Sequence, residues 1–552
     1  MDIFIVRVTL DVDADRDGLV EEDAAGKNAW EFGVGKKGAV ILCNNDDDNN
    51  NTVIDNQNTM IDGPDDVNDL APLIVRQSGI LPSGVSLELS VLDQDKIRIF
   101  DDRSATGTAI IGPAPLPSEF PIIGSATADL ELGMEATQYP DAGFSGLVRL
   151  NLVLKEGGTE LAKDEVVVKS APWMMPSHLN VTDELYVVED IGFNDVFVSG
   201  IQAAATTAGV PLRRANAATY SFDQWMQDTM EIGYSHTSGK TIPVVLQAHR
   251  DRGLQHFARD ELLNRDYGYT EESTLFPTVS PPHNTFDSHG NLEVSPPVTV
   301  DGAEYKFGRI YYGRGRPSTP FNPDVKAFLE AQLIQKPFDL DTDWLGVGHV
   351  DEIISFIPSN VGKNFRMLLA STDEAVRILT DLQTVGHGGL TLFTGKTLAY
   401  LRSLHPSSYD HFHERSIDDI LADGALLAGN ATCQARLDAV QTRLETELEL
   451  DPATDIIKIP SLFIEEPLLP GAFAALIPGM VNLLVITGST FADTQLVIPK
   501  PFGPALPASG GDQLEKDVRD KLTPLGYTLG QIRFIDDFDT YHINLGEVHC
   551  GT

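Results

Sequence analysis

The spacing of apolar residues changes near residue 175, and this change constrains the fold more than any other feature of the sequence. Before it, apolar and polar residues alternate in short runs such as "VSLELSVLD" and "GLVRLNLVL", separated by turns rich in Gly, Pro, Asn and Asp. Alternation with a period of two is typical of half-buried β-strands. Residues 1–175 are therefore predicted to form an all-β domain. Its length and pattern favour an immunoglobulin-like sandwich.

Strand and helix signals alternate from residue 176 to the end. Apolar runs such as "TIPVVLQA" and "QIRFIDDF" predict strands, and longer amphipathic stretches predict helices. The helices are expected at 324–335, 371–386, 433–449 and 511–526. The second begins with Ser371 and Glu374 at the spacing of a capping box. A chain of 552 residues has room for several domains, and we predict two, an all-β domain (1–175) and an α/β domain (176–552).

The charge balance narrows the classes of partner. The chain carries 81 acidic and 40 basic residues, a formal net charge of −41. Such a field repels nucleic acid and anionic membranes and attracts cations, including arginine side chains. The longest apolar runs, such as 480–488, are too short to span a bilayer. We therefore expect neither a nucleic-acid nor a membrane partner.

The three cysteines, Cys43, Cys433 and Cys550, are widely spaced. Their number and spacing argue against a disulfide framework and against a four-cysteine zinc site. The first residues predict a strand rather than a signal peptide, so a reducing, cytoplasmic location is expected. Cys550 lies in "GEVHCGT" at the end of the chain, where chains usually fray. It is therefore either a stray surface thiol or a reactive centre.

Acidic residues are concentrated in two loops of the all-β region. The segment 44–51, "NNDDDNNN", is followed by further aspartates up to Asp69. Oxygen donors at this density suit Ca²⁺, which takes six to eight oxygen ligands; a solvated acidic loop is the alternative. The segment 13–18, "DADRDG", begins like an EF-hand loop, but position 12 falls on Ala24 instead of a glutamate. A calcium-binding loop of a less regular geometry than an EF-hand remains an alternative.

Two clusters in the α/β region combine groups that could do chemistry. His349 and Asp351 in "VGHVDE" stand two residues apart, so in a strand their side chains would face the same side. Asp228 lies in the apolar and aromatic stretch "DQWMQDTMEIGY", and a buried aspartate needs a charged partner, a metal or a proton. The alternatives are a His–Asp hydrogen bond that closes a strand end, and a structural ion pair at Asp228.

Several long stretches together resemble the catalytic domain of protein-arginine deiminases. They are "DQWMQDTMEIGY", "GNLEVSPPVTV", "WLGVGHVDE", "IPKPFGP" and "TYHINLGEVHCGT". The resemblance covers 176–552 and extends back through "DVDADRDG" and "GAVILCNNDDD" into the family's second immunoglobulin-like domain. It implies a five-bladed α/β propeller, the pentein fold, preceded by an immunoglobulin-like calcium-binding domain. The first N-terminal domain of the animal enzymes has no counterpart in this sequence.

The resemblance also implies a reaction, the hydrolysis of peptidyl-arginine to peptidyl-citrulline and ammonia. Cys550 would attack the guanidinium carbon and form a covalent thiouronium-type intermediate, with His349 as general acid and base. Asp228 and Asp351 would hold the guanidinium nitrogens. These residue types suit the chemistry, because paired carboxylates bind a planar cation and a thiolate is a strong nucleophile. The partners would be arginine-containing peptides or proteins.

Four further positions match residues that bind the substrate in the family. Trp225 and Val347 would wall the aliphatic part of the arginine, and Arg250 and Arg252 would bind the peptide backbone. Asn544 stands where some animal members carry an arginine at the mouth of the pocket. Peptide preference is therefore expected to differ, and free or chain-terminal arginine stays a possible substrate.

The resemblance implies Ca²⁺ at several sites. One site in the catalytic domain is intact and uses side chains of Gln227, Glu231 and Glu293 with backbone oxygens of His289 and Leu292. Sandwich sites match Asn44, Asp46, Asp48, Asp55, Asp66 and Asp69, with Asp266 from the catalytic domain. A further site matches Asp13, Asp15, Asp17 and Glu21. A neighbouring catalytic-domain site is altered to Thr229, Gln247, Ala248 and Asp251, so we predict that it is empty or weak.

Two other functions remain to be weighed. One is a related pentein enzyme that acts on free arginine or agmatine, against which the β sandwich, Arg250 and Arg252 argue. The other is a catalytically silent calcium-binding interaction module, which the acidic segment 44–69 would suit. The combination of Cys550 and His349 with the two aspartates argues against that module.

Overall fold

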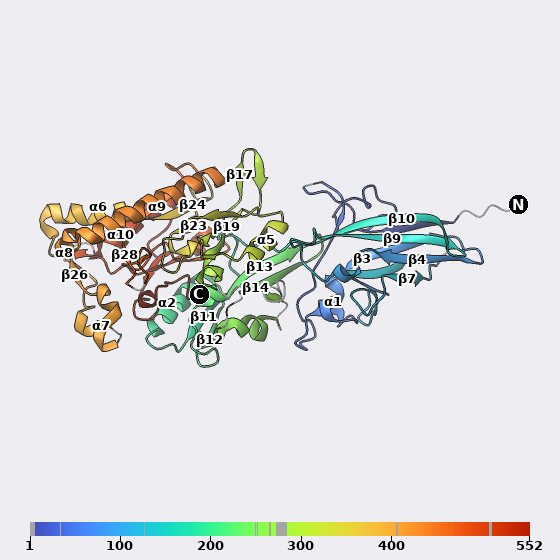
Figure 1. Cartoon of the computed structure of the whole chain (residues 1–552), viewed down its shortest axis with the longest axis horizontal. Helices are drawn as coiled ribbons and strands as arrows, with labels where there is room; N and C mark the ends of the chain where they lie inside the picture. The colour runs from blue at the N-terminus through green and yellow to red at the C-terminus, as the bar shows by residue number, and fades with distance from the viewer. Residues whose placement is uncertain are drawn as a thin grey trace.

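The structure is a computed structural model in which residues 6–33, 35–125, 127–248, 250, 252–263, 267–271, 284–404, 407–467, 469–506 and 511–552 are described. In Figure 1 the N-terminal third forms an elongated β structure at one end of the molecule. The remaining chain forms a mixed α/β structure at the other end, and the C-terminus lies among its elements.

The N-terminal third contains two five-stranded sheets. The first has the order β1 (Arg7–Asp11), β3 (Ala71–Ser78), β8 (Leu130–Ala136), β5 (Ile97–Phe100), β6 (Ala109–Ile111). The second has the order β2 (Ala39–Ile41), β10 (Thr159–Ser170), β9 (Leu147–Glu156), β4 (Val85–Val91), β7 (Glu119–Ile122). In β4 the buried residues are Leu87, Leu89 and Val91. This is the period of two from which an all-β region is predicted.

The connection between the two parts is buried. Trp173, in "SAPWMMPSH", has no exposed surface, and its indole N–H donates to the carbonyl of Val244 in β14 at 3.1 Å. Its backbone N–H donates to Gln332 Oε1 at 3.0 Å. The acidic loop also meets the α/β part, because Asn45 Nδ2 donates to the carbonyl of Tyr269 at 2.9 Å.

Four sheets of the α/β part share one plan, an antiparallel hairpin whose second strand pairs in parallel with a third strand. They are β13–β14–β15 (Met230–His236, Thr241–Gln247, Gly268–Glu271), β16–β19–β22 (Leu292–Val294, Ile310–Gly313, Phe338–Leu340), β23–β24–β27 (Ile354–Pro358, Phe365–Ser371, Ile456–Pro460) and β30–β31–β34 (Leu484–Ile486, Gln495–Pro499, Ile532–Ile535). A parallel pair, β11 (Leu185–Glu189) and β12 (Leu212–Asn216), flanks helix α2 (Asp195–Ala208). This structural repetition is not evident from the sequence.

Short two-stranded pairs complete the sheets. They are β17–β18 (Val298–Val300, Ala303–Tyr305), β20–β21 (Gly315–Arg316, Thr319–Pro320), β25–β26 (Thr391–Leu392, Arg415–Ser416), β28–β29 (Phe463–Glu465, Phe473–Ala475) and β32–β33 (Ala505–Leu506, Gly511–Asp512).

The four predicted helices are present as α5 (Pro323–Ala331), α6 (Thr372–Leu382), α9 (Gly424–Leu448) and α10 (Gln513–Leu522). The other helices are α1 (Pro64–Asp69), α2, α3 (Met226–Thr229), α7 (Leu398–Leu404) and α8 (Ile417–Ala422). Helix α9 begins nine residues before the expected start, because the side chain of Asp423 accepts from the N–H of Leu426 and caps it there. No helix of the described ranges is long and apolar enough to cross a membrane.

The predicted capping box of α6 is only half formed. Ser371 Oγ accepts from the backbone N–H of Glu374 at 3.4 Å. The Glu374 carboxylate does not reach back, since it pairs with Arg377 and Lys521, each at 2.9 Å. Cations nearby therefore compete successfully for this side chain.

Candidate active site

The prediction that His349 and Asp351 share one side of a strand is wrong. His349 precedes a 3₁₀ turn, Val350–Glu352, and the strand β23 begins only at Ile354. Glu352 Oε1 accepts the backbone N–H groups of Gly348 and His349, each at 2.8 Å, and this closes the turn. Gly348 has φ +98°, a conformation that glycine adopts readily. The turn nevertheless brings both side chains to one site.

The end of the chain is anchored rather than frayed. Cys550 is 5% exposed, and its Sγ accepts from Asn482 Nδ2 at 3.3 Å. Asn482 Oδ1 accepts the backbone N–H groups of His549 at 3.0 Å and of Cys550 at 3.3 Å. A single amide side chain therefore holds both the thiol and the backbone of the terminal turn. None of the three cysteines forms a disulfide.

His349 is oriented by one hydrogen bond. Its Nε2 lies 2.7 Å from the carbonyl oxygen of Thr285 and must carry a proton to donate there. Nδ1 then points at Asp228, with 3.6 Å to Oδ1. The backbone of Gly290 lies beneath both groups. A Cβ at residue 290 would stand 2.7 Å from His349 Nδ1, 3.1 Å from Asp228 Oδ1 and 3.2 Å from Asp351 Oδ2. The missing side chain therefore leaves the space that these three residues share.

Asp351 links the histidine turn to the terminal turn. Its Oδ2 lies 3.4 Å from Cys550 Sγ and 3.0 Å from His549 Nδ1. The other oxygen, Oδ1, is buried without a hydrogen-bond partner among the described residues. Burial, then the charges of Asp351 and Asp228, raise the pKa of Cys550 well above its ordinary value. In this arrangement the thiol is protonated and donates to Asp351.

Two arginines, Arg250 and Arg252, surround Asp223 near Asp228. Arg250 is 4% exposed and pairs with Asp223, with 3.0 Å between Nη1 and Oδ2, while its Nη2 lies 3.5 Å from Asp228 Oδ2. Arg252 is half exposed and lies 3.3 Å from Asp223 Oδ1. Trp225 is half-buried against Tyr541, with ring centroids 5.8 Å apart. These contacts leave Arg252 as the more accessible of the two arginines.

Val347 lies next to this group in the chain. It is half-buried, and its carbonyl accepts from Thr285 Oγ1 at 3.0 Å. Thr285 thus contacts both Val347 and His349. The structure therefore places the predicted wall residue two positions from the histidine and fixes it through the same threonine.

The residues of the predicted catalytic-domain calcium site lie beside the candidate active site. Gln227 Nε2 donates to Glu231 Oε2 at 3.1 Å. Burial, with Glu293 nearby, raises the pKa of Glu231 well above its ordinary value, and burial first raises that of Glu293 to about 7. His289 and Leu292 are fully buried. A buried carboxylate, Glu293, and a half-buried one, Glu231, with an amide and backbone oxygens form a hard donor set that fits a divalent cation.

The altered neighbouring set contains neutral, buried side chains. Gln247 Nε2 donates to the carbonyl of Thr229 at 2.6 Å, and Thr229 Oγ1 accepts from Arg250 Nη1 at 2.9 Å. Arg250 therefore places a positive charge among these positions. Asp251, the acidic member of the set, lies outside the described residues.

The acidic residues of the N-terminal β region converge on two adjoining groups. In one group Asp46, Asp48 and Asp69 each offer an oxygen within 4.8 Å of the others, and in the second Asp48, Asp55 and Asp66 do the same. Asn44 Nδ2 donates to Asp66 Oδ1 at 2.7 Å. Both oxygens of Asp46 are buried without a hydrogen-bond partner among the described residues. A shared cluster of buried carboxylates fits bound cations; Asp266 lies outside the described residues.

The loop at 13–18 is more open. Asp13, Asp15 and Asp17 form a third group, and Glu21 is exposed and outside it. Asp13 already accepts from two backbone N–H groups, and Ser238 Oγ donates to its Oδ2 at 2.6 Å. The structure therefore brings together three of the four predicted ligands.

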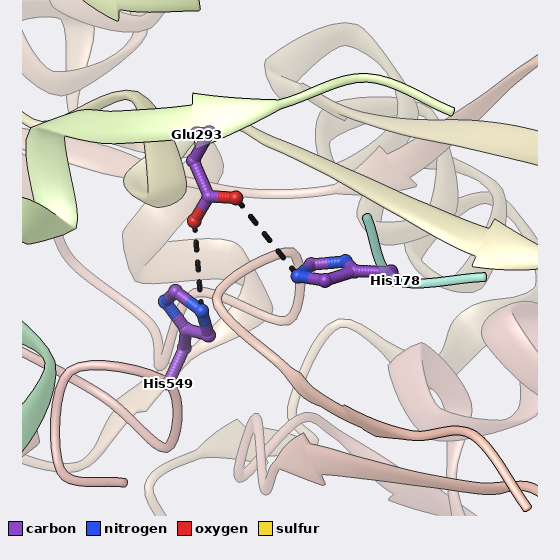
Figure 2. A group of neighbouring side chains, drawn as sticks. All are labelled: His178, Glu293 and His549. Carbon is purple, nitrogen blue, oxygen red and sulfur yellow. Dashed lines mark ion pairs between the residues drawn. The ribbon is translucent and has the colours of Figure 1, made fainter. Parts of the chain in front are cut away.

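Several residues of this site were not predicted. Asn482 interrupts an apolar run and Gly290 stands in a turn, and neither has a sequence signal for its contacts. Asp223, the partner of Arg250, lies only five residues before Asp228. His178 also reaches the site from the connecting segment. Its Nε2 lies 3.9 Å from Glu293 Oε2 (Figure 2).

Matches to family models and matches to whole sequences indicate the same family. A family model described as protein-arginine deiminase matches residues 160–552, and one described as its middle domain matches residues 6–156. Mouse protein-arginine deiminase type-1 is 36% identical over 99% of this chain and 80% of its own length. Human type-4 is 34% identical over 99% of the chain and 81% of its length. Among solved structures, "C. Jejuni Agmatine Deiminase" has 11% identity and a TM-score of 0.33, covering 69% of this chain and 94% of that one.

Proposed function

Because the chain belongs to the protein-arginine deiminase family, a family of hydrolases, we propose that it converts peptidyl-arginine to peptidyl-citrulline and ammonia. The observation that carries the proposal is the convergence on Gly290 and Asp351. Asp228, His349 and Asp351 border the space above Gly290, and Cys550 Sγ lies 3.4 Å from Asp351. A cation-binding pair of carboxylates thus adjoins a thiol and an imidazole.

The guanidinium would lie between Asp228 and Asp351, which pair with its nitrogens. Its positive charge would also offset the two charges that raise the pKa of Cys550, and so favour release of the thiol proton to solvent and formation of the thiolate. Cys550 Sγ then bonds to the guanidinium carbon. One nitrogen leaves with a proton as ammonia, and a thiouronium remains on Cys550.

His349 would supply that proton. Since Nε2 donates to Thr285, the proton is held on Nδ1, the atom that faces Asp228. After ammonia leaves, Nδ1 removes a proton from water, whose oxygen bonds to the thiouronium carbon. The carbon–sulfur bond breaks, the proton of the added hydroxyl is lost to solvent, neutral citrulline leaves and Cys550 regains its thiolate.

Calcium is the proposed cofactor. Gln227, Glu231 and Glu293, with backbone oxygens of His289 and Leu292, would hold one ion, which would neutralise two carboxylates beside the catalytic residues. The acidic groups of the sandwich and the loop at 13–18 would hold others. At the altered set, Thr229, Gln247 and Ala248 with Arg250 nearby support a weak or empty site.

We propose that residues 176–552 form a five-bladed pentein propeller and that residues 1–175 form an immunoglobulin-like domain. Four sheets of one plan and the β11–β12 pair support five blades, and the two five-stranded sheets support a sandwich.

The test replaces Cys550 by alanine and measures citrulline formed from an arginine peptide. We expect the loss of at least about 10³-fold in rate that removal of a nucleophile causes. Cys433→Ala is the matched control, because Cys433 is equally buried but lies in α9. Retained activity in Cys550→Ala would refute the assignment.

A related enzyme acting on free arginine or agmatine is the second candidate. The observation that favours it is the burial of Arg250 against Asp223, which leaves one accessible arginine for a peptide backbone. Relative rates on free and peptidyl arginine decide between the two. A chain that turns over neither, and whose Cys550 resists an amidine-type thiol probe with and without calcium, would instead be a silent calcium-binding module.

A further inference from the structure

Two histidines and a carboxylate meet beside the terminal turn. In Figure 2 the carboxylate of Glu293 lies between the rings of His178 and His549. His549 Nε2 is 3.5 Å from Glu293 Oε1, and His178 Nε2 is 3.9 Å from Oε2. One ligand atom from each residue lies within 4.8 Å of the others. The three residues come from the connecting segment, from β16 and from the last four residues of the chain.

The outward nitrogen of each ring fixes which nitrogen faces the centre. His178 Nδ1 lies 2.9 Å from the carbonyl oxygen of Phe356, and His549 Nδ1 lies 3.0 Å from Asp351 Oδ2. Both oxygens accept hydrogen bonds, so each Nδ1 carries a proton, and each ring in its neutral form turns an Nε2 lone pair toward Glu293. Metal-binding histidines have this arrangement, in which a carbonyl or carboxylate holds the far N–H.

We propose that His178, Glu293 and His549 bind a divalent transition metal of the zinc type. Two imidazoles and one carboxylate, with a fourth position for water, form a donor set that zinc uses in proteins. Imidazole nitrogen suits zinc better than calcium, which prefers oxygen. Bonds of about 2.0–2.2 Å place tetrahedral ligand atoms about 3.3 Å apart. The 3.5 Å contact is close to that spacing, while His178 Nε2, at 3.9 Å from the other oxygen, would have to move inward to join the set.

A metal ion at this position would prevent the substrate from binding, a consequence that rests on the proposed function. A metal on His549 Nε2 keeps its Nδ1–H on Asp351, so that carboxylate stays engaged with His549 and Cys550 instead of a guanidinium. Glu293 is also a proposed calcium ligand. Zinc and calcium would therefore exclude one another there, and zinc would act as an inhibitor that calcium relieves.

The test uses the full chain, stripped of metal by a chelator, and titrates it with Co²⁺ and then Zn²⁺. We expect the visible absorption of four- or five-coordinate Co²⁺ at one equivalent, lost when Zn²⁺ is added. His178→Ala and His178→Asn are expected to lower the affinity at least 10-fold. The asparagine variant can still donate to Phe356, so it separates loss of a ligand from loss of folding. His236→Ala is the control, because His236 is exposed and pairs with Thr241.

Other variants distinguish the alternatives. Cys550→Ala should bind Co²⁺ as the parent chain does, and calcium should weaken that binding. Metal binding that Cys550→Ala abolishes and His178→Asn preserves would place the metal on the thiol and overturn the proposal. These readouts need no turnover, so an inactive enzyme leaves their outcome intact. With an active enzyme, each variant measured against its own calcium-supported rate, half-inhibition of His178→Asn should require at least 10-fold more zinc than that of the parent chain.

Discussion

At the scale of one residue, Gly290 determines the size of the reaction space, the volume that Asp228, His349 and Asp351 border. We expect Gly290→Ala to abolish deimination, because the new Cβ would lie 2.7 Å from His349 Nδ1 and within 3.2 Å of two carboxylate oxygens. The variant should lose at least about 10²-fold in kcat/KM, which corresponds to about 3 kcal/mol. Gly239→Ala is the control, since a Cβ there meets nothing within 4 Å. Equal activity of the two variants would contradict the assigned reaction space.

Asn482 is a positioning residue, and its two ends do different work. Its Oδ1 holds two backbone N–H groups, while its Nδ2 donates to Cys550 Sγ and offsets part of the rise in the thiol's pKa that burial and the charges of Asp351 and Asp228 cause. Asn482→Asp keeps the acceptor but places a carboxylate oxygen against the sulfur. We therefore expect the pH profile of Cys550 alkylation to shift to higher pH, a shift of one unit being about tenfold in thiolate. An unchanged profile would mean that Asn482 is only structural.

How far the site was predictable depends on the kind of residue. The resemblance to a family predicts Cys550, His349, Asp228 and Asp351, and the structure brings these side chains together. Asn482 and Gly290 were not predicted, since their roles arise from contacts between segments far apart in the chain. The contact of His178 with Glu293 was missed for the same reason.

At the scale of elements, the N-terminus of α9 depends on one side chain. Asp423 accepts from the N–H of Leu426 at 3.0 Å, and this backbone hydrogen bond lowers the pKa of Asp423. A carboxyl whose folded pKa is lowered stabilises the fold above its unfolded pKa of about 3.9 and stops doing so as the pH falls through the folded pKa. We expect Asp423→Ala to destabilise the first turn by about 1 kcal/mol at pH 7. Amide exchange at Leu426 measures this.

The control for that cap is Asp423→Asn, which retains an acceptor without a charge. Protection at Leu426 should then be nearly independent of pH between about 5 and 3, whereas in the parent chain it should fall over that range. If both proteins lost protection together, the carboxylate would not be the group responsible.

Elements followed from the sequence where local patterns determine them. The alternation in β4 and the spacing of Leu514, Val518 and Leu522 in α10 matched the observed buried faces. The start of α9 and the turn at 350–352 did not, because side-chain caps at Asp423 and Glu352 decide them. The common plan of the four sheets was also hidden, since it is a pattern of strand pairing that unrelated sequences can satisfy.

At the scale of the whole molecule, calcium bound to the acidic groups of the N-terminal β region should raise the stability of the fold. Asp46 is fully buried and carries two oxygens without a hydrogen-bond partner among the described residues, beside Asp48 and Asp69. Without cation this carboxyl destabilises the fold, and an ion at 100 times its Kd would add about 2.7 kcal/mol to the free energy of unfolding. Asp46→Asn removes the charge and leaves the shape. We therefore expect opposite effects: a Tm equal to or above that of the parent chain in chelator, and a smaller calcium-induced rise.

Thermal unfolding with and without calcium measures both effects, and for a domain of this size about 2.7 kcal/mol corresponds to a rise of roughly 5–10 °C. Asp65→Asn is the matched control, because Asp65 is exposed on α1 beside Asp66 but belongs to neither acidic group. It should respond to calcium as the parent chain does. A variant at Asp46 that lost stability equally with and without calcium would mean that groups of the protein itself stabilise this carboxylate. A cation at Asp46 would then make no contribution to the stability of the N-terminal β region.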